Sequence, residues 1–165
     1  MNFLTVIEER VIGLIRILLG LVMVSMVILN LANAAGRYVG TPIFTGADEL
    51  LVFGMIWLVM IGAVVSTRER KHLSIDVFPQ RLDDKSRLLL NTVVGIFTVV
   101  LATFIAFHSL HFINKISAIG QTSMGMGVPM VIPHFAVFTG FSGIALVTGI
   151  LAIKDFRELI IRRRG

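Results

Sequence analysis

The chain has 165 residues, of which 56% are hydrophobic and 15% are charged, and its mean hydropathy is +0.90. A soluble domain carries about 25% charged residues, so this composition excludes an ordinary soluble domain and indicates a membrane protein with little soluble mass. The absence of cysteine excludes a disulfide framework, a thiolate metal site and a cysteine nucleophile. The net charge of +5 does not indicate nucleic acid, because the basic residues flank apolar runs, where anionic phospholipid headgroups would bind them.

Residues 1–16 form a short lead-in whose apolar residues recur at helical spacing. This pattern predicts a helix in the membrane interface, or else the start of the first span. Residues 17–36 are the first predicted span. Asn30 and Asn33 lie within it, and because an amide in hydrocarbon needs a partner, we expect their face to meet another helix.

Ala32-Asn33-Ala34 resembles a signal-peptide cleavage site behind an apolar run. A leader begins with positive charge, whereas Glu8 and Glu9 are acidic, and the apolar run is long for a leader core. We therefore expect no cleavage.

The second predicted span is 48–67, which begins with Asp48 and Glu49 and ends at a basic cluster that starts with Arg68. About twenty apolar residues match the roughly 30 Å hydrocarbon core of a bilayer. Gly62 offers a small surface for close helix contact. Trp57 lies near the middle of the span, away from the interfaces where Trp is common, so we expect it to pack between helices.

Residues 68–87 carry six Lys and Arg among apolar side chains, which indicates a segment lying on the membrane surface. The third and fourth predicted spans are 88–107 and 135–153, and a basic tail covers 154–165. Between these spans, the Gly-, Met- and Pro-rich stretch 120–133 predicts a compact non-helical turn or a re-entrant piece. The chain is therefore predicted to be an all-α membrane protein with a single four-span domain.

Thirteen of the fifteen Lys and Arg residues fall in the N-terminal lead-in, the 68–87 segment and the C-terminal tail. Arg37 and Lys115 are the other two. The positive-inside rule then places both termini and the 68–87 segment in the cytoplasm.

Between their ends, the four apolar runs contain no Asp, Glu, Lys, Arg or His. Pumps, proton relays and carriers of charged solutes keep ionisable groups at membrane depth, so this absence favours a packing partner over a conduit. We expect no catalytic residue, metal site or cofactor.

Three other functional classes have some support in the sequence. A redox membrane anchor would hold haem or quinone through His108, His111 and His134, and a Soret band would reveal it. A self-sufficient small transporter or channel would show uptake by this chain alone. Gly140-Phe141-Ser142-Gly143 resembles the serine motif of intramembrane proteases, but no span supplies the base that such a serine requires.

Two blocks of sequence resemble the small membrane subunit of tripartite ATP-independent periplasmic (TRAP) transporters, the DctQ-like family. The first block comprises Asp48-Glu49-Leu50-Leu51, Trp57-Leu58, Gly62-Ala63 and the ending Arg68…His72-Leu73-Ser74-Ile75-Asp76. The second comprises Thr122-Ser123, Pro129, Ile132-Pro133-His134 and Gly140-Phe141.

The resemblance implies a complex in the bacterial inner membrane. A large membrane subunit would carry the substrate and sodium sites and move as an elevator, and a periplasmic binding protein would deliver an organic acid, with C4-dicarboxylates and sialic acid among the family's substrates. The small subunit would be a fixed, non-enzymatic scaffold that braces the large subunit and helps to dock the binding protein.

Two interface hypotheses follow from this resemblance. The small-residue and Asn faces, with Trp57, are expected to pack against the large subunit, and they include Asn30, Asn33 and Gly62. Glu49 at the outer end of the second span, and Arg68, His72 and Asp76 at its inner end, are expected to fix the position of the span by pairing either within the chain or with the large subunit. Alternatively, Arg68 only follows the positive-inside rule and contacts lipid headgroups. The binding protein is expected to meet Asp48, Glu49, Lys115 and the 120–133 turn, unless these residues only cap helices and satisfy loops.

Overall fold

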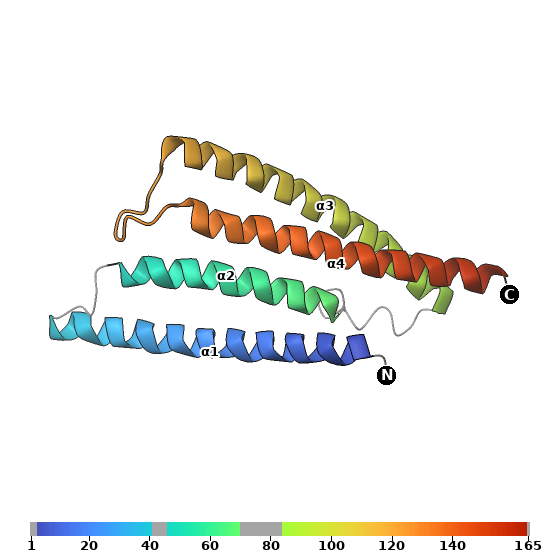
Figure 1. The fold of residues 1–165 in the computed structure, drawn as a ribbon, viewed down its shortest axis with the longest axis horizontal. Coiled ribbons are helices and arrows are strands. Elements are labelled where there is room, and N and C mark those ends of the chain that lie inside the picture. The colour runs from blue at the N-terminus through green and yellow to red at the C-terminus, as the bar shows by residue number, and fades with distance from the viewer. Residues whose placement is uncertain (1–2, 41–45, 70–83, 165) are drawn as a thin grey trace. The chain divides into compact units, whose positions relative to one another are not determined.

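The computed structural model describes residues 3–40, 46–69 and 84–164. This part of the chain contains four α-helices: α1 (Phe3–Val39), α2 (Ala47–Arg68), α3 (Asp84–Ile119) and α4 (Val131–Arg164) (Figure 1). Within these described ranges the extended backbone is limited to an isolated bridge between Thr122 and Pro129. The predicted all-α fold class is therefore confirmed.

Each of the four helices is long and apolar enough to cross a membrane. The 22 residues of α2 rise about 33 Å at 1.5 Å per residue, close to the hydrocarbon thickness. Helices α1, α3 and α4 have 37, 36 and 34 residues, so each is longer than one crossing requires. The predicted number of membrane-crossing helices is confirmed.

The helix bounds extend beyond the predicted spans. Helix α1 continues without a break from Phe3, so the predicted lead-in 1–16 and the first span share one helix. Helix α3 continues past the predicted end at 107 as far as Ile119. Helix α3 ends at Ile119 and helix α4 begins at Val131, so residues 120–130 of the predicted 120–133 turn are non-helical. Pro133 is accommodated in the first turn of α4, where a backbone N–H would have no intrahelical acceptor.

Glycines with positive φ end two of the helices. Gly120 has φ +67°, and its N–H donates to the carbonyl of Ser117, while the N–H of Gln121 donates to the carbonyl of Ile116. This pair of bonds is the Schellman arrangement, which satisfies the last carbonyls of α3. Gly40, with φ +79°, follows α1 in the same way and donates to the carbonyl of Arg37.

The chain packs as two compact units. The first comprises Met1–Gly62 and Ile113–Ala136. In it, α1 and the first part of α2 run side by side in opposite directions (Figure 1). They touch where a Cβ added at Gly54 would lie 3.1 Å from the sulfur of Met26, so this glycine allows the two helices to approach closely.

The second unit comprises Ala63–Phe112 and Val137–Gly165. Small residues mark its helix contacts, as expected for membrane helices, which gain little from burying apolar surface against one another. A Cβ at Gly95 of α3 would lie 3.0 Å from the Cβ of Ala152 of α4, next to the fully buried Thr148. A Cβ at Gly143 of α4 would lie 2.8 Å from Val64 of α2, so larger residues at either glycine would separate the helices.

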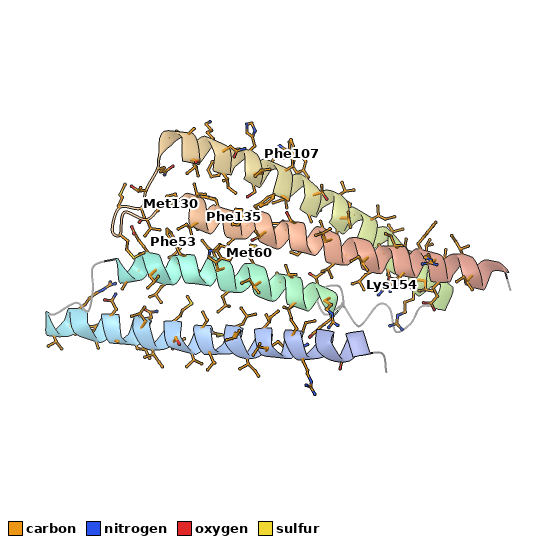
Figure 2. The ribbon with its side chains drawn as sticks, in the orientation of Figure 1. Phe53, Met60, Phe107, Met130, Phe135 and Lys154 are labelled. Carbon is orange, nitrogen blue, oxygen red and sulfur yellow. The ribbon has the colours of Figure 1, made fainter. Side chains whose placement is uncertain are left out.

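Large apolar side chains are exposed along every helix. Examples are Leu21 and Ile28 of α1 and Phe97, Phe104 and Phe107 of α3, the last of which is labelled in Figure 2. In water such surfaces would aggregate, whereas in a bilayer they contact acyl chains or another membrane protein. The protein is therefore built for a hydrocarbon environment.

Candidate functional site

The first turn of α2 carries the acidic pair that the sequence singled out, Asp48 and Glu49. Gly46 precedes the helix with φ +98°, and its carbonyl accepts the N–H groups of Glu49 and Leu50. A carboxylate in a first helical turn is also favoured by the helix dipole. Local backbone contacts thus define the start of α2, independently of the distant contacts that its side chains make.

The carboxylate of Glu49 binds the backbone of the loop between α3 and α4. The N–H of Gly125 donates to its Oε1 at 2.7 Å, and the N–H of Met126 donates to its Oε2 at 2.9 Å. Bonds to an ionised acceptor are stronger than neutral ones, so Glu49 holds a loop that lies 76 residues away in sequence.

Glycine at position 125 permits this close approach. A Cβ added there would lie 3.1 to 3.2 Å from the carboxyl atoms of Glu49. Two successive N–H groups that point at one anion form a backbone concavity of the kind that binds carboxylate and phosphate. Here the protein's own side chain fills that concavity.

The loop also has its own hydrogen bonds. The N–H of Ser123 donates to the carbonyl of Val128 at 2.8 Å, and its hydroxyl accepts the N–H of Val128 at 3.2 Å. The N–H of Met130 donates to the carbonyl of Gln121, which closes the base of the loop. Residues 121–130 therefore form a structured turn, which is one of the two forms predicted for the 120–133 stretch.

A pocket of about 370 Å³ lies between the start of α2 and this loop. Phe53 and Met130, both labelled in Figure 2, contribute apolar surface to its lining. Asp48 and Glu49 contribute its carboxylates, and both already accept hydrogen bonds from within the chain. Among the described residues, no group of three His, Cys, Asp or Glu side chains is placed to hold a metal ion. The arrangement is suited to holding the loop in place.

Asp48 joins α2 to the end of α1. Its carboxylate accepts bonds from Arg37 at 2.6 Å and 2.5 Å, and the Asn33 amide donates to Oδ1 at 3.3 Å. The Arg37 and Asp48 side chains are exposed, whereas Asn33 is only 4% exposed. An exposed ion pair contributes little, but a buried amide is costly when it loses its acceptor. The stabilising part of this cluster is therefore the Asn33 bond.

This difference predicts unequal effects for the two charged residues. Asp48→Ala leaves the buried Asn33 amide without its acceptor, so we expect a loss of about 1 to 2 kcal/mol. Arg37→Ala removes only the exposed pair, and we expect less than about 1 kcal/mol. The resistance of each purified variant to unfolding by SDS measures both effects. Equal losses would show that the ion pair is the main contribution.

Trp57 packs between helices, as the sequence predicted. Its ring lies 6.5 Å from that of Phe135, with an interplanar angle of 50°. The contact joins α2 to Phe135, the fifth residue of α4, within the first unit. Tilted aromatic pairs at this distance contribute about 0.5 to 1.5 kcal/mol beyond their buried area.

Comparison with known proteins identifies the family of this chain. Residues 26–158 match the family model described as "Tripartite ATP-independent periplasmic transporters, DctQ component". The chain belongs to the DctQ family of TRAP transporters. This small permease subunit is a multi-pass protein of the bacterial inner membrane and is not an enzyme.

Two relatives show what this DctQ subunit is similar to. The ectoine TRAP transporter small permease protein TeaB of Halomonas elongata is 28% identical over 151 residues, which are 90% of this chain and 75% of TeaB. The isethionate TRAP transporter permease protein DctMQ of Oleidesulfovibrio alaskensis is 23% identical over 129 residues, which are 74% of this chain. The match covers only 19% of DctMQ, so in that protein a region like this one is part of a much longer chain.

The remaining residues predicted for partner contacts differ in their surroundings. Asn30 lines an apolar groove between α1 and α2, and Gly62 has open space around its Cα. Arg68 is the last residue of α2, and Lys115 is exposed on α3. His72 and Asp76 lie outside the described residues.

The histidines considered as haem ligands do not strengthen the redox alternative. The Nδ1 of His108 lies 3.0 Å from the carbonyl of Phe104, one turn earlier on α3. Its ring centroid lies 4.1 Å from that of Phe104, so the imidazole packs against its own helix. Membership of the DctQ family favours the transport function.

Sequence reasoning missed the partners of the acidic pair. In the sequence Arg37 stands out only as one of the two basic residues outside the basic segments, yet it binds Asp48 eleven residues later. One signal was available, because opposite charges on either side of a short helix connection are often paired. The contribution of Gly125 and Met126 had no comparable signal, because they offer backbone N–H groups, which every residue except proline has.

Proposed function

We propose that this DctQ subunit is a fixed scaffold in a sodium-driven, binding-protein-dependent TRAP transporter of organic acids. It braces the large membrane subunit, which carries substrate and sodium, and helps to dock the periplasmic binding protein. The observation that carries this proposal is the absence of Asp, Glu, Lys, Arg and His from residues 17–36, 50–67, 88–107 and 135–153. Helices that carried charged solutes would need such groups at membrane depth.

Two further observations support the scaffold role. The polar side chains at the start of α2 are used to tie α1, α2 and the 121–130 loop together. The DctMQ relative joins a region like this chain to a much longer permease chain. Its name and that of TeaB specify isethionate and ectoine, which supports assigning substrate choice to other subunits. We propose that the organic acid carried by this transporter is a C4-dicarboxylate or sialic acid.

The proposed orientation follows from the positive-inside rule. Both termini and the basic 68–87 segment face the cytoplasm and its anionic phospholipids, and the start of α2 and the 121–130 loop face the periplasm. Arg68, His72 and Asp76 then close the cytoplasmic end of the second span and fix its position, either within this chain or against the large subunit.

The proposal is tested by reconstituting the chain with its cognate large subunit in proteoliposomes. We expect the two proteins to co-purify, and uptake of an organic acid to require both subunits, a sodium gradient and the loaded binding protein. Uptake by this chain alone, or failure to recover the large subunit, would overturn the scaffold assignment.

The exposed Lys115 provides a test of docking. Reversing its charge with Lys115→Glu is expected to raise the binding-protein concentration for half-maximal uptake on the order of threefold to tenfold, without changing maximal uptake. Reversing Asp48 is less informative, because it also breaks the bonds to Arg37 and Asn33. Lys154→Glu, on the proposed cytoplasmic side, is the matched control. An equal shift in both variants would refute a role for Lys115 in docking.

A further inference from the structure

An open groove of about 320 Å³ lies between α1 and α2 within the first unit. Four residues of α1 and four of α2 line it: Met23, Met26, Val27 and Asn30, and Leu51, Val52, Met55 and Leu58. Seven of these eight side chains are apolar, and the eighth is the amide of Asn30. The groove thus combines an apolar wall with a single hydrogen-bonding group.

The two asparagines of α1 have different roles. Asn33 is 4% exposed, and its amide donates to Asp48. Asn30 lies on the open groove, and in the described part of the chain its side chain makes no hydrogen bond. Acyl chains offer neither a donor nor an acceptor, so an amide at this depth requires a polar group from another protein segment.

The residues along both walls recur at the spacing of a helix-packing seam. On α1, Gly20, Val27 and Ala34 are seven residues apart, and all three are exposed. On α2, Leu51, Met55, Leu58 and Gly62 follow at steps of four, three and four residues. Such steps are the a and d positions that receive another helix in left-handed packing.

Glycines extend this seam beyond the groove itself. A Cβ added at Gly20 or Gly62 would meet no other atom within 4 Å. Gly54, in contrast, already faces Met26 of α1. Close helix packing in membranes uses small residues of this kind, so the open glycines leave room for the backbone of a third helix.

We propose that one transmembrane helix of the large permease subunit packs into the α1–α2 groove and presents a hydrogen-bonding side chain to Asn30. This inference rests on the proposed scaffold function and names the surface that performs it. The large subunit is the chosen occupant because lipid cannot satisfy Asn30. The DctMQ relative, moreover, has a region like this chain within a much longer permease chain, which brings the remaining permease segments close to it.

Site-specific photocrosslinking from two adjacent residues of α1 tests the position of this helix. Val27 lines the groove, whereas Ile28 is one residue further around α1, and both are exposed. With a benzophenone amino acid at position 27, we expect a product of this chain with the large subunit in membranes that contain both. The same probe at position 28 should give at least about fivefold less of this crosslinked product, because successive helical residues point about 100° apart.

The absence of the position-27 product in a complex that co-purifies, or stronger crosslinking from position 28, would overturn the proposal. A product with a second copy of this chain, or with lipid only, would also overturn it.

The amide itself is tested by Asn30→Leu, which keeps the size of the side chain and removes its hydrogen bonds. Interhelical hydrogen bonds in membranes contribute modestly, so we expect about threefold lower recovery of the large subunit after stringent detergent washing. Ser25→Ala is the control, because Ser25 donates to the carbonyl of Leu21 on its own helix. Unchanged resistance of the isolated Asn30→Leu chain to SDS separates this effect from misfolding. Full recovery with Asn30→Leu would refute the hydrogen bond.

The outcomes for the two proposals are distinguishable. If the wild-type chain does not recover the large subunit, the scaffold function fails. If the large subunit is recovered but crosslinks only through other faces, such as exposed Phe104 on α3, the scaffold function stands and the groove assignment fails.

Discussion

Replacing Glu49 with alanine is expected to release the loop between α3 and α4. The substitution removes the acceptor for the N–H groups of Gly125 and Met126. Hydrogen bonds to a charged acceptor are among the stronger ones, so amide exchange at residues 125 and 126 should accelerate by about tenfold or more. Hydrogen-exchange mass spectrometry of the chain in lipid nanodiscs measures this directly.

Two comparisons make the Glu49 prediction specific. Glu49→Gln keeps one carbonyl oxygen as acceptor, so its effect should lie between those of wild type and Glu49→Ala. The bond from the Met130 N–H to Gln121 does not involve Glu49, so exchange at residue 130 should change less. Identical exchange in wild type and Glu49→Ala would mean that the loop is held by its internal bonds alone.

If the loop docks the binding protein as proposed, Glu49→Ala also has a functional consequence. An ordered binding surface costs less entropy to occupy than a disordered one. The variant should therefore require more binding protein for half-maximal uptake, although its loop retains every side chain that could contact the partner.

Replacing Gly46 with alanine is expected to destabilise the first unit by about 2 kcal/mol or more. The φ of +98° is unfavourable for any residue with a Cβ, which costs about 1 to 2 kcal/mol. The new methyl group would also lie 2.4 Å from the Cγ of Met126, so the Met126 side chain or the loop must move. Loss of helicity and of Trp57 fluorescence during SDS titration reports the change.

The chain offers matched controls for this prediction. Gly40 also has a positive φ, of +79°, but an added Cβ meets nothing within 4 Å, so Gly40→Ala should show the backbone cost alone. Adding Met126→Ala to Gly46→Ala should remove the steric part and reduce the loss to that of Gly40→Ala. If both single glycine variants lose the same stability, Met126 does not restrict position 46.

The sequence was sufficient to predict the membrane class, the four helices and a non-helical stretch within 120–133. Each of these features depends on local properties: apolar runs long enough to cross a bilayer, charges that end them, and glycine and proline that end helices. The same local sequence patterns identified the acidic pair at the start of α2 and a face of α1 that carries asparagine. The helices extend beyond the predicted spans, because a helix can continue past the hydrocarbon through polar residues such as His108, His111 and Lys115.

The family resemblance was also readable from the sequence, because it rests on the order and spacing of short motifs. What each motif residue contacts was not readable. Asn30 and Asn33 look equivalent in the sequence, yet one lines an open groove and the other is buried against Asp48. Likewise, the sequence left open whether Glu49 pairs within the chain or with a partner, and in the structure it binds Gly125 and Met126 of its own chain.

The sequence by itself therefore determined the environment of this protein, the number of its helices and the positions where its polar groups occur. The tertiary structure decided which of those groups are satisfied within the chain and which face outward. The physical reason is that a helix buried in lipid is apolar on nearly all sides, so its sequence pattern does not specify how it is rotated about its axis. That rotation is set by close packing, such as Met26 against Gly54, and by hydrogen bonds between distant segments, such as Glu49 with the 121–130 loop.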